Sequence, residues 1–118
     1  MYLTINAKIN NPLNSYEEAI EFLTHLADKG GFVISSPEAH YVTTEGNQGV
    51  TATAFIDTGK VSFHIWDENQ PATLDFEMTG AIDKTLVMNA ISRKFDTTSG
   101  VCKVYTDVDG DLLEETSF

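Results

Sequence analysis

Residues 54–66, with the sequence AFIDTGKVSFHIW, hold the densest group of side chains that could do chemistry. Asp57, Thr58 and Gly59 have the order of an aspartic protease loop, in which two carboxylates share a proton and a single copy needs a symmetric dimer. The supporting residues are missing, because Lys60 stands where a small residue is usual and no glycine near the C-terminus follows two apolar residues. The triplet is also ordinary turn chemistry, with Gly59 free to take a positive φ. We therefore interpret it as a β-hairpin.

Other candidate chemistries have weak support in the sequence. The three histidines, His25, His40 and His64, share no metal-ligand spacing with each other or with a cysteine. The acidic segment 107–111 resembles a calcium loop, but its glycine comes too early and no glutamate stands at the twelfth position. Cys102 alternates with valines in a strand pattern, which is typical of an inert buried thiol. We expect no metal site.

Composition narrows the function further. The chain of 118 residues fits one domain, residues 1–118, and its 42% hydrophobic content suffices for a core. Its 18 acidic residues against 7 Lys and Arg give a net charge of −11, which disfavours nucleic acids and anionic membranes. There is one cysteine, no signal-peptide pattern and no apolar run of the ~20 residues that a membrane helix needs. We expect a soluble, cytoplasmic protein.

Hydrophobic periodicity predicts six strands and two helices. A capping box at Ser15 and Glu18 begins the first helix, which ends at Gly30-Gly31, and an apolar stripe from Ile82 to Phe95 marks the second. Residues 40–48 fit either an edge strand or a loop, residues 96–100 a turn, and the acidic tail 107–118 a loosely held end. The predicted strands are 2–9, 32–35, 49–56, 60–66, 72–78 and 101–106.

The order of these elements predicts the fold class. Successive strands with short connections pair antiparallel, and two helices cannot cover both faces of such a sheet. We expect an α/β (α+β) two-layer sandwich, a mostly antiparallel sheet with both helices on one face. The face away from the helices then carries Phe55, His64 and Trp66 among polar residues. Such a mixed face favours a homodimer that packs these faces together, although a solvated face with two stray aromatics is the simpler alternative.

Residues 49–68, GVTATAFIDTGKVSFHIWDE, resemble the processing region of the prokaryotic S-adenosylmethionine decarboxylases. That family has Gly-Val-Ser-Gly, an apolar strand, Glu-Ser-His, two residues and Ile-His-Thr-Trp-Pro-Glu. The two patterns align without a gap, and a strand ending at Gly80 and then a helix follow in both. The identical residues are Gly49, Val50, Ile56, His64, Trp66 and Glu68.

The resemblance implies a fold, a substrate class and a site. The family fold is an α/β sandwich whose sheets pack across a dimer, and its substrate is the sulfonium cation S-adenosylmethionine, whose product feeds polyamine synthesis. His64 would keep the role of the histidine that assists processing. The candidate ligand-binding residues on or near the mixed face are Trp66, Glu68, Phe55, Asp75 and Glu77.

The family's chemistry does not carry over to this sequence. Those enzymes convert a serine into a pyruvoyl cofactor, which acts as an electron sink for the substrate. The alignment places Gly59 at that serine and Thr79 at the family's proton-donating cysteine. Glycine has no hydroxyl, and neither Thr58 nor Ser62 stands at the aligned position. We expect no pyruvoyl group and no pyruvoyl-dependent decarboxylation.

Three hypotheses for function remain. The first is a non-processing homologue that binds S-adenosylmethionine, its decarboxylated form or a polyamine, with His64, Trp66 and Glu68 lining the site. The second is a lyase that cleaves S-adenosylmethionine without a pyruvoyl group, using His64, Asp75, Glu77 or Glu68 as base. The third is a scaffold or regulatory partner of an active decarboxylase.

Overall fold

The computed structural model describes the whole chain, residues 1–118, as seven strands and two helices. In chain order these are β1 (Tyr2–Ile9), α1 (Tyr16–Gly30), β2 (Ile34–Val42), β3 (Gly49–Ile56), β4 (Gly59–Trp66), β5 (Ala72–Thr79), α2 (Lys84–Phe95), β6 (Thr97–Tyr105) and β7 (Leu112–Ser117).

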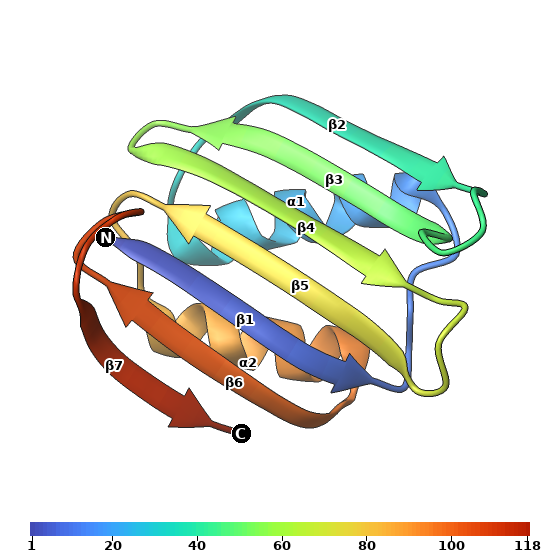
Figure 1. Cartoon of the computed structure of the whole chain (residues 1–118). Helices are drawn as coiled ribbons and strands as arrows, with labels where there is room; N and C mark the ends of the chain where they lie inside the picture. The colour runs from blue at the N-terminus through green and yellow to red at the C-terminus, as the bar shows by residue number, and fades with distance from the viewer.

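All seven strands belong to one sheet, in the order β2-β3-β4-β5-β1-β6-β7 (Figure 1). Every neighbouring pair is antiparallel, which confirms the predicted pairing. The first strand of the chain lies between β5 and β6. Residues of β1 therefore lie beside those of β5, some seventy positions later in the sequence, as the pair Asn6 and Asp75 illustrates.

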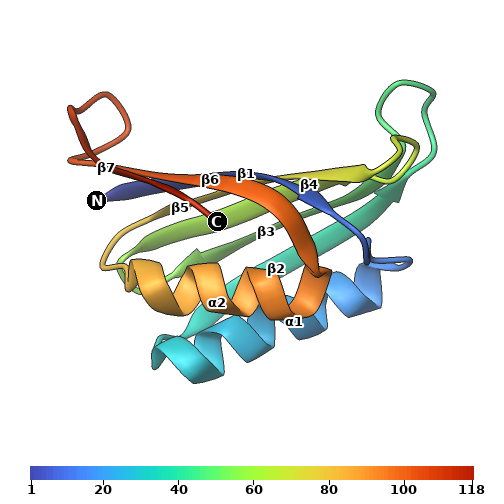
Figure 2. The same ribbon diagram turned by 90° about the horizontal axis from the view of Figure 1, so that it is seen from below.

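The molecule has two layers, with both helices on one face of the sheet (Figure 2). The alternate apolar residues of β3, β4 and β5, which leave out Phe55 and Trp66, point toward the helices and are buried, as their alternation predicts. Phe22 of α1 contacts Phe95 of α2 and Phe63 of β4 edge-to-face, at ring-centroid distances of 5.0 and 5.8 Å. The predicted two-layer sandwich is confirmed. Neither helix is long and apolar enough to cross a membrane.

Local sequence signals determine where the helices begin and end. The amide of Glu18 donates to Ser15 Oγ at 3.3 Å, and Gly31 ends α1 with a φ of 70°. The second helix starts later than its apolar stripe indicates, because Asp83 is its N-cap and accepts from the amide of Leu86 at 3.1 Å. Ile82 precedes the helix and packs against the core from there.

The second strand is longer than predicted. Instead of stopping at Ser35, it runs to Val42 across a bulge, where Ser36 has a φ of 50° and the register shifts before Glu38. Pro37 has no amide hydrogen to donate to a neighbouring strand. It is tolerated because β2 is an edge strand and because Pro37 lies in the bulge, where the pairing with β3 is interrupted. Part of the ambiguous segment 40–48 is therefore edge strand, and the remainder is the loop to β3.

The prediction of a loosely held tail is wrong. Leu112–Ser117 forms β7 and pairs with β6, which itself begins at Thr97 inside the predicted turn. Two of its acidic residues meet lysines, with Nζ–O distances of 3.0 Å for Lys84–Glu114 and 3.6 Å for Lys103–Glu115. The high charge of the tail favoured a loose end in the sequence analysis. In the structure, backbone pairing with β6 and the lysines of neighbouring elements hold it in place.

Candidate functional site

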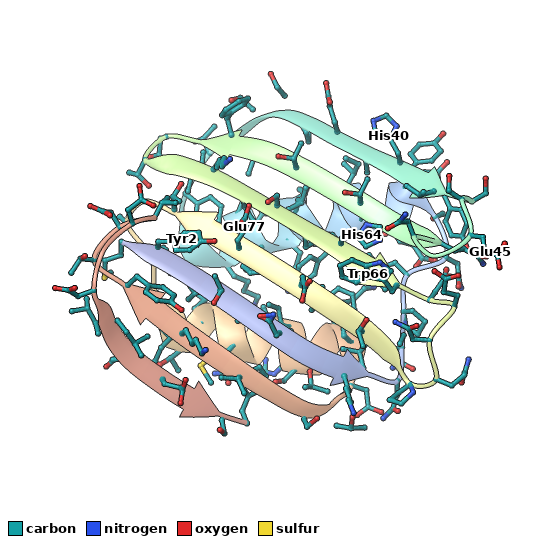
Figure 3. All side chains as sticks on the ribbon, in the orientation of Figure 1. Tyr2, His40, Glu45, His64, Trp66 and Glu77 are labelled. Carbon is teal, nitrogen blue, oxygen red and sulfur yellow. The ribbon has the colours of Figure 1, made fainter.

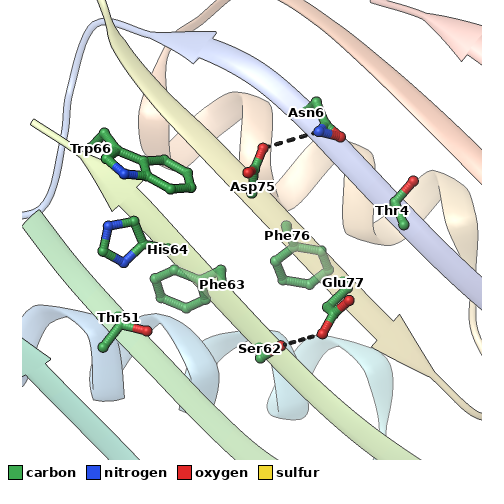
Figure 4. Close-up of a pocket in the computed structure, with 10 residues that line it drawn as sticks. All are labelled: Thr4, Asn6, Thr51, Ser62, Phe63, His64, Trp66, Asp75, Phe76 and Glu77. Atoms are coloured by element: carbon green, nitrogen blue, oxygen red, sulfur yellow. Dashed lines mark hydrogen bonds between the residues drawn. The ribbon is translucent and has the colours of Figure 1, made fainter. Parts of the chain in front are cut away.

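The face of the sheet away from the helices, here called the open face, contains a hollow of about 410 Å³ (Figure 4). Strands β1, β3, β4 and β5 supply its walls, while Phe63 and Phe76 belong to the buried core beneath it. No lysine or arginine lines the hollow. Its polar and aromatic lining consists of Thr4, Asn6, Thr51, Ser62, His64, Trp66, Asp75 and Glu77.

Strand register explains why four of the predicted site residues meet there. His64 of β4 lies opposite Asp75 of β5, and Ser62 lies opposite Glu77. Trp66 follows His64 on the same face, and the two rings meet edge-to-face at a centroid distance of 4.2 Å. Figure 3 shows His64 and Trp66 side by side on β4 with Glu77 further along β5. The structure thus brings together His64, Trp66, Asp75 and Glu77.

The two carboxylates of the hollow are held by fixed donors. Asn6 Nδ2 donates to Asp75 Oδ1 at 3.0 Å. The Tyr2 hydroxyl donates to Glu77 Oε2 at 2.7 Å, and Ser62 Oγ donates to Glu77 Oε1 at 3.0 Å. Burial and the bond to Glu77 together raise the pKa of Tyr2 from 10.0 to about 12. Both carboxylates are therefore positioned without being neutralised by a cation.

His64 has an incomplete set of hydrogen bonds. Its Nε2 atom is buried and has no hydrogen-bond partner in the chain. A buried polar atom without a partner is uncommon in folded proteins and indicates a missing partner or a functional role. The neighbouring residues across the sheet are Thr51 on one side and Asp75 on the other, so the imidazole lies among polar groups.

Two predicted ligand-binding residues lie outside the hollow. Glu68 accepts from the amides of Gly46 and Gln48, at 3.2 and 3.1 Å, and so anchors the loop between β2 and β3. Phe55 is 61% exposed and lies opposite Lys60 near the far end of the β3–β4 hairpin. Neither side chain lines the hollow around His64.

Gly59 and Thr79 lie close together at the β3–β4 hairpin. They are the positions that the resemblance assigns to the processing serine and to the proton-donating cysteine. There the residues 58–60 lie against the end of β5 and the residues 79–81, an arrangement that we call the clasp. The amide of Lys60 donates to Thr79 Oγ1 at 3.0 Å, and the amide of Ala81 donates to Thr58 Oγ1 at 3.1 Å. The turn itself is Asp57-Thr58, since Ile56 pairs with Gly59.

The reason for a glycine at position 59 differs from the predicted one. Its φ is not positive, so the turn does not require glycine. A Cβ at this position would instead lie 2.7 Å from Thr79 Oγ1 and closer still to the Thr79 carbonyl oxygen. Gly80, with a φ of 118°, is equally enclosed, because its Cβ would lie 2.7 Å from the Thr58 carbonyl oxygen. Both glycines allow the two backbones to approach closely.

This crowding bears on the pyruvoyl group that the resemblance implies. A pyruvoyl group forms from a side-chain hydroxyl, and position 59 offers neither the hydroxyl nor the space for its Cβ. Thr58 Oγ1 and Thr79 Oγ1, the nearest hydroxyls of the clasp, both accept backbone amides. The residues present do not fit the cofactor.

Sequence reasoning missed the contribution of β1 to the hollow. Thr4 and Asn6 occupy the polar side of an alternating strand, which the sequence shows, but only the strand order places them beside β5. Tyr2, which binds Glu77, is separated from it by 75 positions. No local pattern connects such distant residues. Elsewhere, Cys102 is buried and its pKa is raised by burial, which suits an inert thiol.

Comparison with known proteins agrees with this architecture. The S-adenosylmethionine decarboxylase family matches residues 5–106 of the chain. The crystal structure of the adenosylmethionine decarboxylase from Aquifex aeolicus VF5 is similar, with a TM-score of 0.71 and 18% identity over 98% of this chain and 94% of that one. No curated protein sequence matches the chain. Since the family match covers most of the residues, the chain belongs to the S-adenosylmethionine decarboxylase family.

Proposed function

We propose that this chain binds S-adenosylmethionine, its decarboxylated form or a polyamine in the hollow, and that it does so without pyruvoyl-dependent decarboxylation. The observation that carries the proposal is the clasp. The position that the resemblance assigns to the processing serine is Gly59, and Thr79 occupies the space that its side chain would need. Chain cleavage by an acyl shift needs a hydroxyl next to the scissile carbonyl, so it has no nucleophile here.

The neighbouring hydroxyls do not offer a substitute. Thr58 Oγ1 accepts the Ala81 amide at 3.1 Å and lies one residue before the aligned position. Ser62 lies within β4 and donates to Glu77 at 3.0 Å. A nucleophile misplaced by even an ångström loses much of its rate, and each of these hydroxyls already has a different partner.

The hollow has the chemistry that a cation requires. Asp75 and Glu77 supply two negative charges, no basic side chain lines the hollow to compete for them, and Trp66 adds an aromatic ring. An aromatic ring attracts a cation by about 0.5–2 kcal/mol, depending on how dry the site is. Sulfonium and ammonium groups are both cations of this kind. The support is one of charge and shape, and it applies equally to the three ligands.

A second copy of the chain is the proposed cover of this site. The hollow is open on the side away from the helices, and the face around it carries half-buried aromatic and polar side chains such as Trp66 and Tyr2. A two-fold dimer that packs open face on open face would enclose the ligand. The mass in solution tests this, since a dimer has twice the 13.0 kDa of one chain.

A lyase is the second candidate, and His64 favours it. The imidazole lines the hollow opposite Asp75, and its Nε2 atom, which is buried, has no partner in the chain. A base there would take a proton from the carbon next to the C–S bond of S-adenosylmethionine. That bond would then break, and its electron pair would stay on sulfur, giving neutral methylthioadenosine and an alkene. No pyruvoyl group is needed because the sulfonium is already a good leaving group.

Calorimetric titration separates these functions. We expect S-adenosylmethionine, its decarboxylated form or spermidine to bind, and methylthioadenosine, which lacks the positive charge, to bind at least about tenfold more weakly. Binding without product supports the proposal, and accumulation of methylthioadenosine supports the lyase. If none of the cations binds, the proposal is wrong and a scaffold for an active decarboxylase becomes the better account.

A further inference from the structure

The helical layer contains a second concave site, here called the helix groove. It lies between α1 and α2, has a volume of about 480 Å³, and is lined by residues of the two helices and by Asp83, the N-cap of α2, with no strand contributing. It is therefore on the opposite side of the molecule from the hollow (Figure 2). The lining residues that matter for its chemistry are His25, Lys29, Leu86, Ala90, Arg93 and Lys94.

The charge of the helix groove is opposite to that of the protein. The chain has 18 acidic residues and only 7 Lys and Arg, yet three of the 7, Lys29, Arg93 and Lys94, line this one groove. Asp83 is its single carboxylate, and one oxygen of that group already accepts the amide of Leu86 at 3.1 Å. A net positive site on a strongly acidic chain needs an explanation.

Ion pairing within the chain does not explain these cations. The two salt bridges of the structure are Lys84–Glu114 and Lys103–Glu115, and neither involves the helix groove. Lys29, Arg93 and Lys94 have no carboxylate within 4.0 Å although acidic side chains are abundant. Their charges are available to a ligand.

The helix dipole does not explain their convergence either. Lys29 lies in the last turn of α1, and Arg93 and Lys94 lie in the last turn of α2, where cations stabilise a helix. The two helices run antiparallel, so these last turns are at opposite ends of the helical layer (Figure 2). The helix dipole explains why each cation lies at the end of its helix. It does not explain why all three side chains line the same groove.

The floor of the helix groove is apolar. Leu86 and Ala90 are half-buried and lie between the cations, whose side chains are exposed. The volume falls within the range of small-molecule sites, about 300–1,000 Å³. We propose that the helix groove binds a small organic anion with two or more negative charges on an apolar or aromatic body, a class to which nucleoside di- and triphosphates belong. Arg93 and Lys94, at the end of α2, would hold the anionic groups, and Leu86 and Ala90 would contact the body.

The proposal is independent of the cation site in the hollow and is tested with ATP as the probe. We expect isothermal titration at low salt to give a submillimolar Kd, weakened by added salt. Adenosine, which lacks the phosphates, should not bind, and inorganic triphosphate, which lacks the body, should bind more weakly than ATP. The overall charge of −11 suppresses non-specific binding of anions, so a signal reports the groove.

A double variant locates the site. Arg93→Gln with Lys94→Gln should weaken ATP binding by about tenfold or more for each lost cation, while Lys8→Gln, on β1 away from the helices, should leave it unchanged. The substituted side chains are exposed, so the fold should tolerate them, and amide NMR shifts confined to α1 and α2 give a second readout. The proposal is wrong if ATP does not bind, or if the double variant binds it as well as the unmodified protein.

Discussion

The hollow and the clasp lie on the same hairpin, β3–β4, and differ in how much room they leave. In the hollow, His64 lies between Thr51 and Asp75, and both carboxylates accept hydrogen bonds from side chains of other strands. In the clasp, Gly59 and Gly80 allow the backbones to approach so closely that the Thr58 and Thr79 hydroxyls accept amides of the opposite segment. No space remains there for a further side chain. One end of the hairpin is open to a ligand and the other is closed.

This contrast separates two requirements of the family: binding a cationic ligand and forming the pyruvoyl group. Cation binding, as we propose it, requires only charge and surface, which Asp75, Glu77 and Trp66 of the open face supply. Making a pyruvoyl group requires one hydroxyl in one geometry, and Gly59, at the position that the resemblance assigns to the processing serine, has no hydroxyl. The closed clasp adds a steric obstacle to the chemical one. We infer that restoring the serine alone would not restore processing.

Gly59→Ser should therefore produce the largest effect. The new side chain would collide with the carbonyl oxygen and hydroxyl of Thr79, which are held by the end of β5. We expect the free energy of unfolding to fall by about 2–3 kcal/mol, measured by urea denaturation. The chain should also remain uncleaved.

A matched control isolates the cause. Asp57→Ser changes an exposed residue of the same turn and should cost little stability. If Gly59→Ser is as stable as the unmodified protein, or if it splits into two fragments, the clasp is not the obstacle that we describe.

Trp66→Ala should affect binding more than folding. Loss of the aromatic contact should weaken binding of S-adenosylmethionine about tenfold, measured by titration calorimetry. Phe55→Ala is the control, because Phe55 is a large aromatic residue on the same hairpin, is 61% exposed and lies outside the hollow. Equal losses for the two variants would remove the distinction between the hollow and the rest of the open face.

Glu68→Gln tests whether Glu68 acts on the ligand or on the loop. The structure gives its two oxygens to the amides of Gly46 and Gln48, so we expect faster hydrogen exchange at these amides and a loss of about 1 kcal/mol in stability. Ligand affinity should stay the same. A large drop in affinity with unchanged exchange would place Glu68 in the site, as the sequence first indicated.

Tyr2→Phe should have the smallest effect, visible only at high pH. The pKa of Tyr2 is raised from 10.0 to about 12, so the neutral phenol is favoured in the folded state. Its contribution to stability is present below pH 10 and is lost as the pH rises toward 12. The difference in unfolding free energy between the unmodified protein and the variant should narrow over this interval. A constant difference would mean that Tyr2 and Glu77 are not coupled.

The sequence was sufficient for the layers of this fold because each layer has its own periodicity. Alternation identified the buried residues of β3, β4 and β5, and the Ser15 capping box identified the start of α1. The sequence was insufficient for the two edge strands of the sheet, β2 and β7. The strand β2 continues through Pro37 by means of a bulge, and β7 is a strand because its backbone pairs with β6, with Lys84 and Lys103 meeting two of its glutamates. Both depend on contacts that local propensity does not contain.

The candidate site divides in the same way. Residues on one strand or on neighbouring hairpin strands, such as His64, Trp66 and Asp75, could be assigned to one surface from alternation alone. Tyr2 and Asn6 could not, because only the insertion of β1 beside β5 brings them to the carboxylates. The bonds of Glu68 to the amides of Gly46 and Gln48 could not be predicted either, because its place two residues after Trp66 says nothing about the loop that it anchors.

The central claim is that the chain keeps the family fold and loses the family cofactor, and its intact mass tests this most directly. Mass spectrometry of the purified protein under denaturing conditions should give a single chain of 13.0 kDa. It should give no second fragment after prolonged incubation, because Gly59 has no hydroxyl to start the acyl shift. Two fragments from cleavage within residues 57–63, with a carbonyl group at the new N-terminus, would contradict the account.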